Sequence, residues 1–99
     1  MCGRFAFFED PKVIVEQFQL PELPDIEPNY NITPSAEIGT VGEHPETGNR
    51  SFAKLSWGLI PFWADSPDSF RGNLINARAE TVHEKNSFKR SFRKRRCII

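Results

Sequence analysis

Short apolar segments separated by polar turns run along the chain and predict a sheet of several strands. Residues 2–8 are mostly apolar and predict a strand that enters the core. Residues 37–42 and 51–57 predict two further strands, and residues 44–49 between them, which include Pro and Gly, predict the loop of a hairpin. Residues 74–78 predict another short strand.

Two segments have the spacing of amphipathic helices. The first starts at Asp10, a preferred N-cap residue, and is followed by Pro11, which suits the first helical position. Its apolar positions fall on one face until about Leu20. The second starts at Glu80 and brings Phe88 and Phe92, four residues apart, onto one face.

The remaining segments predict connections rather than regular elements. Prolines and acidic residues mark residues 21–28 as an extended connector, and residues 29–34, with two asparagines and a proline, predict an irregular segment. The 99 residues suffice for one small domain with a modest core. We therefore predict an α+β fold: a curved, mainly antiparallel, barrel-like sheet with flanking helices.

The last residues predict the opening of another strand. A basic turn, residues 93–96, runs into Cys97-Ile98-Ile99, which we expect to be buried, with Cys97 as a core thiol. Residues 1–99 are therefore expected to be the N-terminal portion of a single larger domain, with an incomplete sheet. Exposed strand edges and apolar surface then predict a homo-dimer or a complementary C-terminal half as partner.

Charge is balanced overall but unevenly distributed. Residues 1–50 hold 3 basic and 9 acidic residues, a net charge of −6, whereas residues 51–99 hold 10 and 4, a net charge of +6. This asymmetry indicates either an anionic partner for the second half or pairing of the two halves within the molecule. Seven of the twelve residues 85–96 are basic, which fits a solvated helix face or a face that follows a phosphate backbone.

Several classes of protein are excluded by composition. No segment approaches the roughly 20 apolar residues of a membrane span, so no membrane partner is expected, and no secretory signal is visible. The chain has only two cysteines, which predicts a reducing, cytoplasmic compartment. The cysteines and the two histidines, His44 and His83, lack paired ligand spacing, so no metal and no cofactor is expected.

The second residue, Cys2, carries the most distinctive chemistry. Cys is small enough for a preceding Met to be removed, which would leave an α-amine and a thiol on adjacent carbons. Such an aminothiol condenses with an aldehyde to a Schiff base and closes to a thiazolidine, or its thiol attacks an acyl carbon with the amine as base. The structural alternative is a small buried apolar residue. The position of Cys2 alone leaves all three open.

Five motifs occur in a characteristic order. They are Cys2-Gly3-Arg4-Phe5, Asn29-Tyr30-Asn31-Ile32-Thr33-Pro34, Trp57-Gly58-Leu59-Ile60-Pro61-Phe62-Trp63, Ile75-Asn76-Ala77-Arg78-Ala79-Glu80-Thr81, and the segment from Phe88 to Ile99. In this order and spacing they resemble the SOS response-associated peptidase (SRAP) family over essentially the whole chain.

The resemblance implies a function in DNA damage. Members of this family recognise abasic sites in single-stranded DNA and shield them by a covalent link through the N-terminal Cys after Met removal. The family is also associated with thiol peptidase activity, because its members remove their own first residues. In a bacterium the protein would then be associated with the nucleoid.

The resemblance also implies roles for individual residues. Cys2 matches the nucleophile, and Asn76 matches the Asn that orients the sugar and the attacking terminus. Arg4 and Arg78 match phosphate contacts, for which ion pairs with Glu9 and Glu80 are the structural alternatives. The other matching positions line or support the DNA cleft: Asn31, Pro34, Trp57, Pro61 and Trp63. Of the two tryptophans, Trp57 is expected in the core and Trp63 at the cleft.

Two departures from the family pattern change these expectations. Asn29 stands where most relatives have Arg, which removes one phosphate contact. The family's catalytic Glu and His correspond to positions after Ile99, and His44 and His83 belong to other motifs. The resemblance therefore implies a half-domain that is slow or inactive.

Two other functions remain open. One is an N-terminal-nucleophile Cys amidohydrolase, because class II glutamine amidotransferases also begin Met-Cys-Gly, although they usually have an apolar residue in place of Arg4. The other is a noncatalytic fragment that binds single-stranded DNA. A glutaminase assay identifies the first, and equal binding to intact and abasic strands identifies the second.

Overall fold

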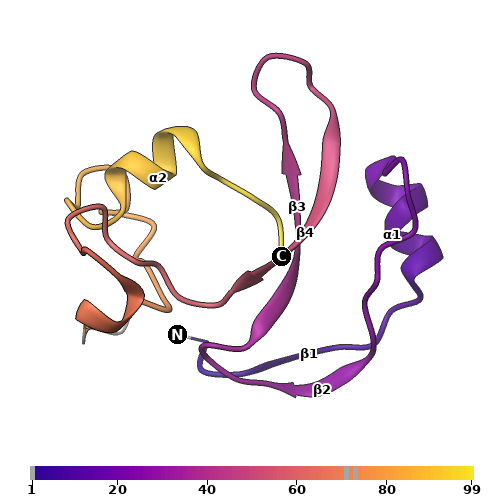
Figure 1. Cartoon of the computed structure of the whole chain (residues 1–99), viewed down its shortest axis with the longest axis horizontal. Coiled ribbons are helices and arrows are strands. Elements are labelled where there is room, and N and C mark those ends of the chain that lie inside the picture. Colours follow the sequence, from indigo (N-terminus) through magenta and orange to yellow (C-terminus); the bar gives the residue numbers. More distant parts are fainter. Residues whose placement is uncertain (1, 71, 73) are drawn as a thin grey trace.

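The computed structural model describes residues 2–70, 72 and 74–99, and its described residues form a small α+β fold (Figure 1). The described elements, in chain order, are β1 (Phe5–Phe7), α1 (Pro11–Phe18), β2 (Asn29–Ile32), β3 (Glu37–Glu43), β4 (Arg50–Ser56), the 3-10 turn η1 (Pro67–Ser69) and α2 (Lys89–Lys94). The strands pair as two antiparallel ribbons, β1 with β2 and β3 with β4. The α+β class is confirmed, whereas the described strands do not close into a barrel.

The β3–β4 hairpin is the longest element and stands between α1 and the segment that leads to α2 (Figure 1). Its register runs without interruption from Glu37 opposite Ser56 to Glu43 opposite Arg50, which confirms the predicted hairpin. In its loop, His44 Nδ1 accepts the backbone N–H groups of Glu46 and Thr47, each at 3.3 Å.

The β1–β2 ribbon crosses the base of the molecule. Phe5 pairs with Ile32 and Phe7 with Asn29, with a register irregularity between them. The prediction of an irregular segment at residues 29–34 is therefore wrong for Asn29–Ile32. Residues 29–34 are rich in residues that favour turns, which is why the local sequence predicts an irregular segment. The extended backbone of Asn29–Ile32 instead results from pairing with β1, more than twenty residues earlier in the chain.

The first helix forms as its end signals predict. Asp10 has an extended backbone and its carboxylate accepts the N–H of Lys12 at 2.9 Å, with Pro11 in the first turn. The helix ends at Phe18, two residues before the predicted end. The next residue, Gln19, adopts a left-handed conformation with φ of 55° and donates its N–H to the Val15 carbonyl.

The second half of the chain is less regular than predicted. Helix α2 begins at Lys89 rather than at Glu80, because residues 79–84 form turns. The predicted strand at residues 74–78 is also wrong. Leu74 accepts a hydrogen bond from Leu59 at 3.0 Å, but no ladder of pairs follows among the described residues.

The apolar core is thin and remains open on one side. The buried apolar residues of the described chain include Leu20, Ile32, Ile38 and Val41. Beside them, a groove of about 490 Å³ lies between α1, the β1–β2 ribbon and the β3–β4 hairpin, with mostly apolar walls. Gly39 lines this groove, and a Cβ there would lie 2.6 Å from Ile26 Cδ1, so a larger residue would require the Ile26 side chain to shift.

The C-terminal residues meet the free edge of β3. Val41 and Ile98 exchange both backbone hydrogen bonds at 2.9 Å, as in an antiparallel pair. The predicted strand opening therefore pairs as expected, but its burial is wrong. Ile98 is 55% exposed and Cys97 is exposed too, because the described chain places no layer over this segment.

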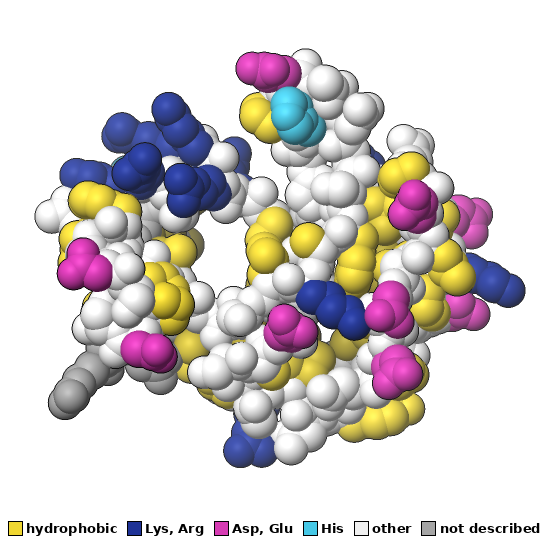
Figure 2. All heavy atoms as spheres, in the orientation of Figure 1, with side chains coloured by type: hydrophobic (Ala, Val, Ile, Leu, Met, Phe, Trp, Pro, Cys, Tyr) yellow, Lys and Arg dark blue, Asp and Glu magenta, His cyan; other side chains and the backbone are white. Residues whose placement is uncertain are grey.

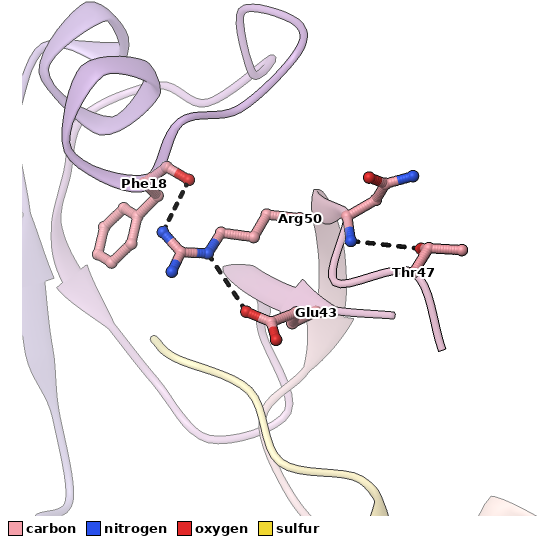
Figure 3. Close-up of polar contacts among 5 residues, drawn as sticks. Phe18, Glu43, Thr47 and Arg50 are labelled. Atoms are coloured by element: carbon pink, nitrogen blue, oxygen red, sulfur yellow. Dashed lines mark hydrogen bonds and ion pairs between the residues drawn. The ribbon is translucent and has the colours of Figure 1, made fainter. Parts of the chain in front are cut away.

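Arg50 connects the hairpin to the end of α1 (Figure 3). Its Nη1 donates to the Phe18 carbonyl at 3.2 Å, and its Nε donates to Glu43 Oε2 at 3.4 Å. A cation at the carbonyl end of a helix also interacts favourably with the helix dipole. Arg50 therefore holds α1 against the hairpin at one end of the apolar groove.

We expect Arg50→Met to lower the free energy of unfolding by about 1 kcal/mol, because the helix-end hydrogen bond and a partly exposed ion pair are lost together. Urea denaturation of the 99-residue chain measures this. The matched control is Glu43→Gln, which removes only the ion pair and is expected to cost less than about 0.5 kcal/mol. An equal loss in both variants would contradict a role for the bond to Phe18.

Candidate functional site

Cys2 is held by one side chain from a segment distant in the sequence. The Cys2 N–H donates to Asn76 Oδ1 at 3.2 Å, and Asn76 Nδ2 donates to the Cys2 carbonyl at 2.9 Å. The two groups are 74 positions apart in sequence, and Cys2 is exposed while Asn76 is half-buried. One amide therefore clamps the backbone of Cys2 on both sides and leaves its thiol accessible.

Trp57 positions both halves of this clamp. Its ring packs edge-on against Phe5, with centroids 5.3 Å apart, and its Nε1 donates to the Ile75 carbonyl at 3.2 Å. Phe5 opens β1 just after Cys2, and Ile75 immediately precedes Asn76. A half-buried indole that needs a partner for its N–H thus connects the first strand to the segment that carries Asn76.

Arg4 and Asn31, expected separately at the DNA site, form one unit. Arg4 Nη1 donates to Asn31 Oδ1 at 2.9 Å, while Asn31 N–H donates to Asn29 Oδ1, also at 2.9 Å. The described chain contains no ion pair between Arg4 and Glu9, so that structural alternative is not realised. Asn29 thus orients the backbone of Asn31, the residue that holds Arg4.

The Cys2 thiol belongs to the same network. Its Sγ donates to the Arg4 carbonyl at 3.2 Å, so the chain turns back on itself between residues 2 and 4. Hydrogen bonds therefore link the exposed Cys2, Arg4 and Asn31 and the half-buried Asn76 into one network at the end of the β1–β2 ribbon.

Three other expected site residues lie outside this network. Pro34 is half-buried in the turn after β2, and Arg78 is exposed without an ion pair to Glu80 in the described chain. Trp63 is 49% exposed and packs edge-on against Phe62, with centroids 5.1 Å apart. Trp57 is half-buried rather than part of the core that was expected, Trp63 is exposed, and its place at a DNA cleft stays a prediction. Pro61, in the same aromatic loop, is fully buried.

An exposed aromatic pair beside the cluster was not anticipated from the sequence. Phe8 and Tyr30 stack with centroids 5.6 Å apart and an interplanar angle of 11°, although they are 63% and 73% exposed. Only the pairing of β1 with β2 brings the two rings together. The available signal was Tyr30 itself, a large ring within a polar segment.

The apolar groove and the histidines are not part of this cluster. The apolar groove of about 490 Å³ is lined by Phe5 and Asn29 at one edge but not by Cys2, Arg4 or Asn76. Within the described residues, no three side chains of His, Cys, Asp or Glu gather as a metal site. No helix in the described ranges is long and apolar enough to span a membrane.

We expect Asn76→Ala to mobilise the first residues without unfolding the domain, because both hydrogen bonds to Cys2 are lost while Trp57 still holds Ile75. The ¹H–¹⁵N heteronuclear NOE of the Cys2 and Gly3 amides should fall below that of β1. Asn86→Ala is the matched control, since Asn86 is exposed and its side chain makes no hydrogen bond to the described residues. Equal NOE values in both variants would contradict the clamp.

Comparisons with known proteins extend over the whole chain. The family model for SOS response associated peptidase (SRAP) matches residues 1–99. The abasic site processing protein YoqW of Bacillus subtilis (strain 168) is 44% identical over 100% of this chain and 44% of its own length. The abasic site processing protein HMCES of Pongo abelii is 32% identical over 100% of this chain and 34% of its own. The chain thus spans less than half the length of these relatives.

A solved structure has the same fold. The crystal structure of a protein from Bordetella bronchiseptica superposes with a TM-score of 0.71 over 99% of this chain and 47% of that chain, at 24% sequence identity. The motifs, the fold and the relatives agree, and the chain belongs to the SOS response associated peptidase (SRAP) family.

Proposed function

We propose that this chain recognises abasic sites in single-stranded DNA and forms a covalent thiazolidine crosslink to them through Cys2. The observation that carries the proposal is the Asn76 clamp, which fixes the Cys2 nitrogen and leaves the thiol exposed. The relatives named abasic site processing proteins support the choice of substrate.

The reaction begins once Met1 is absent, because the Cys2 nitrogen is otherwise part of a peptide bond. Hydrolysis of the Met1–Cys2 bond releases an α-amine, and the thiol peptidase activity of the family supplies a route for that hydrolysis within the chain. In the neutral amine, Asn76 Oδ1 accepts one N–H and the lone pair remains free to attack. Asn76 is thus an orienting group for the nucleophile rather than a proton carrier.

The substrate is the open-ring sugar of an abasic site, which presents an aldehyde. The amine nitrogen bonds to the aldehyde carbon, and water leaves to form the imine. The Cys2 sulfur then bonds to the same carbon, and its proton passes to the imine nitrogen. The product is a five-membered thiazolidine, and the overall change is the loss of one water.

Arg4 and Arg78 supply contacts to phosphate in this proposal. The hydrogen bond to Asn31 fixes the orientation of the Arg4 guanidinium but occupies only part of its donor fork, so donors remain for a phosphate. Arg78 is exposed two residues after Asn76. Phosphate contacts set the register of a strand, and here they would bring the sugar to Cys2.

Pro34 and Trp63 complete the proposed DNA-binding surface. The half-exposed indole of Trp63 offers a face on which a base can stack, the usual device of proteins that bind single strands. We propose that the reaction takes place in the cytoplasm, on nucleoid DNA in a bacterial cell.

The rate of the 99-residue chain is proposed to be slow. The family resemblance assigns a proton relay in imine formation to a Glu and assistance of sugar-ring opening to a His. Neither matches a residue of this sequence, and neither His44 nor His83 lies in the Cys2 network. The open apolar groove and the exposed Ile98 support a second copy or a complementary C-terminal half as partner.

Intact-mass spectrometry tests the crosslink. The chain without Met1, incubated with an abasic single-stranded oligonucleotide, should give a species equal to protein plus DNA less one water, and an undamaged strand should give none. Cys2→Ala should abolish the adduct, because it removes the sulfur that closes the ring. Cys97→Ala is the matched control, since both thiols are exposed, and it should retain the adduct.

Two further assays, of glutaminase activity and of DNA affinity, identify the other functions. Ammonia release from glutamine by the chain without Met1 would indicate an amidohydrolase. Equal affinity for intact and abasic strands with no adduct would indicate a noncatalytic DNA-binding protein. Either result, found together with no adduct to the abasic strand, would overturn the crosslinking proposal.

A further inference from the structure

A second concentration of basic residues lies away from the Cys2 network. Figure 2 shows Lys and Arg side chains gathered over α2, at the upper left of the view. Five exposed residues form what we term the α2 basic surface: Arg90, Arg93, Lys94, Arg95 and Arg96. The 99-residue chain has zero net charge, so any attraction of this surface for an anion must be local.

The helix geometry places the cations together. Positions 90, 93 and 94 are separated by three and four residues and therefore share one face of α2. Phe88 and Phe92 point from the opposite side and are half-buried. The exposed cationic face therefore lies opposite the half-buried rings, and the Arg96 guanidinium reaches over the Phe92 ring, 5.2 Å from its centroid.

No carboxylate in the described chain neutralises this surface. The ion pairs among the described residues join Arg50 to Glu43 and Lys54 to Asp25, on the hairpin and the connector. Arg93 and Lys94 lie in the last turn of α2, where cations interact favourably with the helix dipole. The helix dipole thus accounts for Arg93 and Lys94, whereas Arg90, Arg95 and Arg96 have no carboxylate partner among the described residues.

Exposed aromatic rings continue the surface. The Arg90 guanidinium lies over Phe62, 5.8 Å from its centroid, and Phe62 packs edge-on against Trp63. Phe62 is 61% exposed and Trp63 49%. Cations interleaved with accessible rings are typical of proteins that bind single-stranded nucleic acid, whereas an acidic peptide would need only the cations.

We propose that the α2 basic surface, together with Phe62 and Trp63, binds the phosphodiester backbone of single-stranded DNA that flanks the abasic site. The identity of the ligand rests on the function proposed above, but the contact itself needs no covalent chemistry. The α2 basic surface would bind a part of the DNA strand that Arg4 does not contact. It would thereby lengthen the bound segment of DNA, and it would take no part in the reaction at Cys2.

Salt-dependent binding tests this proposal in a Cys2→Ala background, where no crosslink forms. Fluorescence anisotropy with an undamaged single-stranded oligonucleotide should give a log Kd that rises linearly with log NaCl concentration. Arg93→Gln with Lys94→Gln should lower that slope by about 1.4, because each phosphate contact to a single strand contributes roughly 0.7. Neither side chain makes a hydrogen bond or ion pair within the described residues, and circular dichroism checks that the fold is retained.

Two control variants separate a local contact from net charge. Lys12→Glu changes the net charge by the same amount on exposed α1 and should leave the slope unchanged. Arg93→Lys with Lys94→Arg keeps the charge and should retain the slope of the parent chain. A double Gln variant with an unchanged slope, or a Lys12→Glu variant with an equal loss, would overturn the proposal.

A test of the aromatic residues shows whether the ligand of this surface is DNA or an acidic protein. Trp63→Leu should weaken oligonucleotide binding roughly tenfold with little change in slope, because stacking on a base is lost while the phosphate contacts remain. Poly-glutamate should compete poorly with the oligonucleotide. Equally effective competition by poly-glutamate, or no oligonucleotide binding at all, would refute a DNA-binding surface. Because Cys2 is absent, these results do not depend on whether the crosslink forms.

Discussion

Much of this fold depends on the half-buried indole of Trp57. The backbone of Trp57 exchanges hydrogen bonds with Ser35 and Ala36, so the residue extends the end of the hairpin. Its ring packs against Phe5 and its N–H reaches the Ile75 carbonyl. An edge-on aromatic pair adds about 1 kcal/mol beyond its area burial, and the hydrogen bond contributes about as much again. One side chain thereby brings together three distant segments, and the Cys2–Asn76 clamp forms where they meet.

The same arrangement keeps the Cys2 network apart from the apolar groove. Phe5 and Ile32 line the groove, whereas Arg4 and Asn31 do not line it and bond to each other instead. The β1–β2 ribbon therefore contributes to the groove and to the Cys2 network with different residues.

Charge has two different uses in the molecule. On the hairpin and the connector, Arg50 and Lys54 pair with carboxylates and hold elements together. On α2, the cations have no such partners in the described chain and lie beside exposed rings. Among the described residues one ion pair, Lys54 with Asp25, joins the two halves. Pairing within the described part of the molecule therefore accounts for little of the opposite net charges, which was one of the two explanations that composition left open.

Local signals in the sequence determined the elements whose stability is local. Asp10 and Pro11 specified the start of α1, because capping needs only neighbouring backbone groups, and alternating residues around a short polar loop specified the hairpin. The ordered motifs specified the family and pointed to Cys2 and Asn76 before any geometry was known. Tertiary structure alone decided that Asn29–Ile32 is a strand, that residues 74–78 are not, and that Cys97 is exposed. Each of these three features depends on which distant segment of the chain packs against the residues concerned. The contact between Cys2 and Asn76 likewise results from that packing and not from any local sequence pattern.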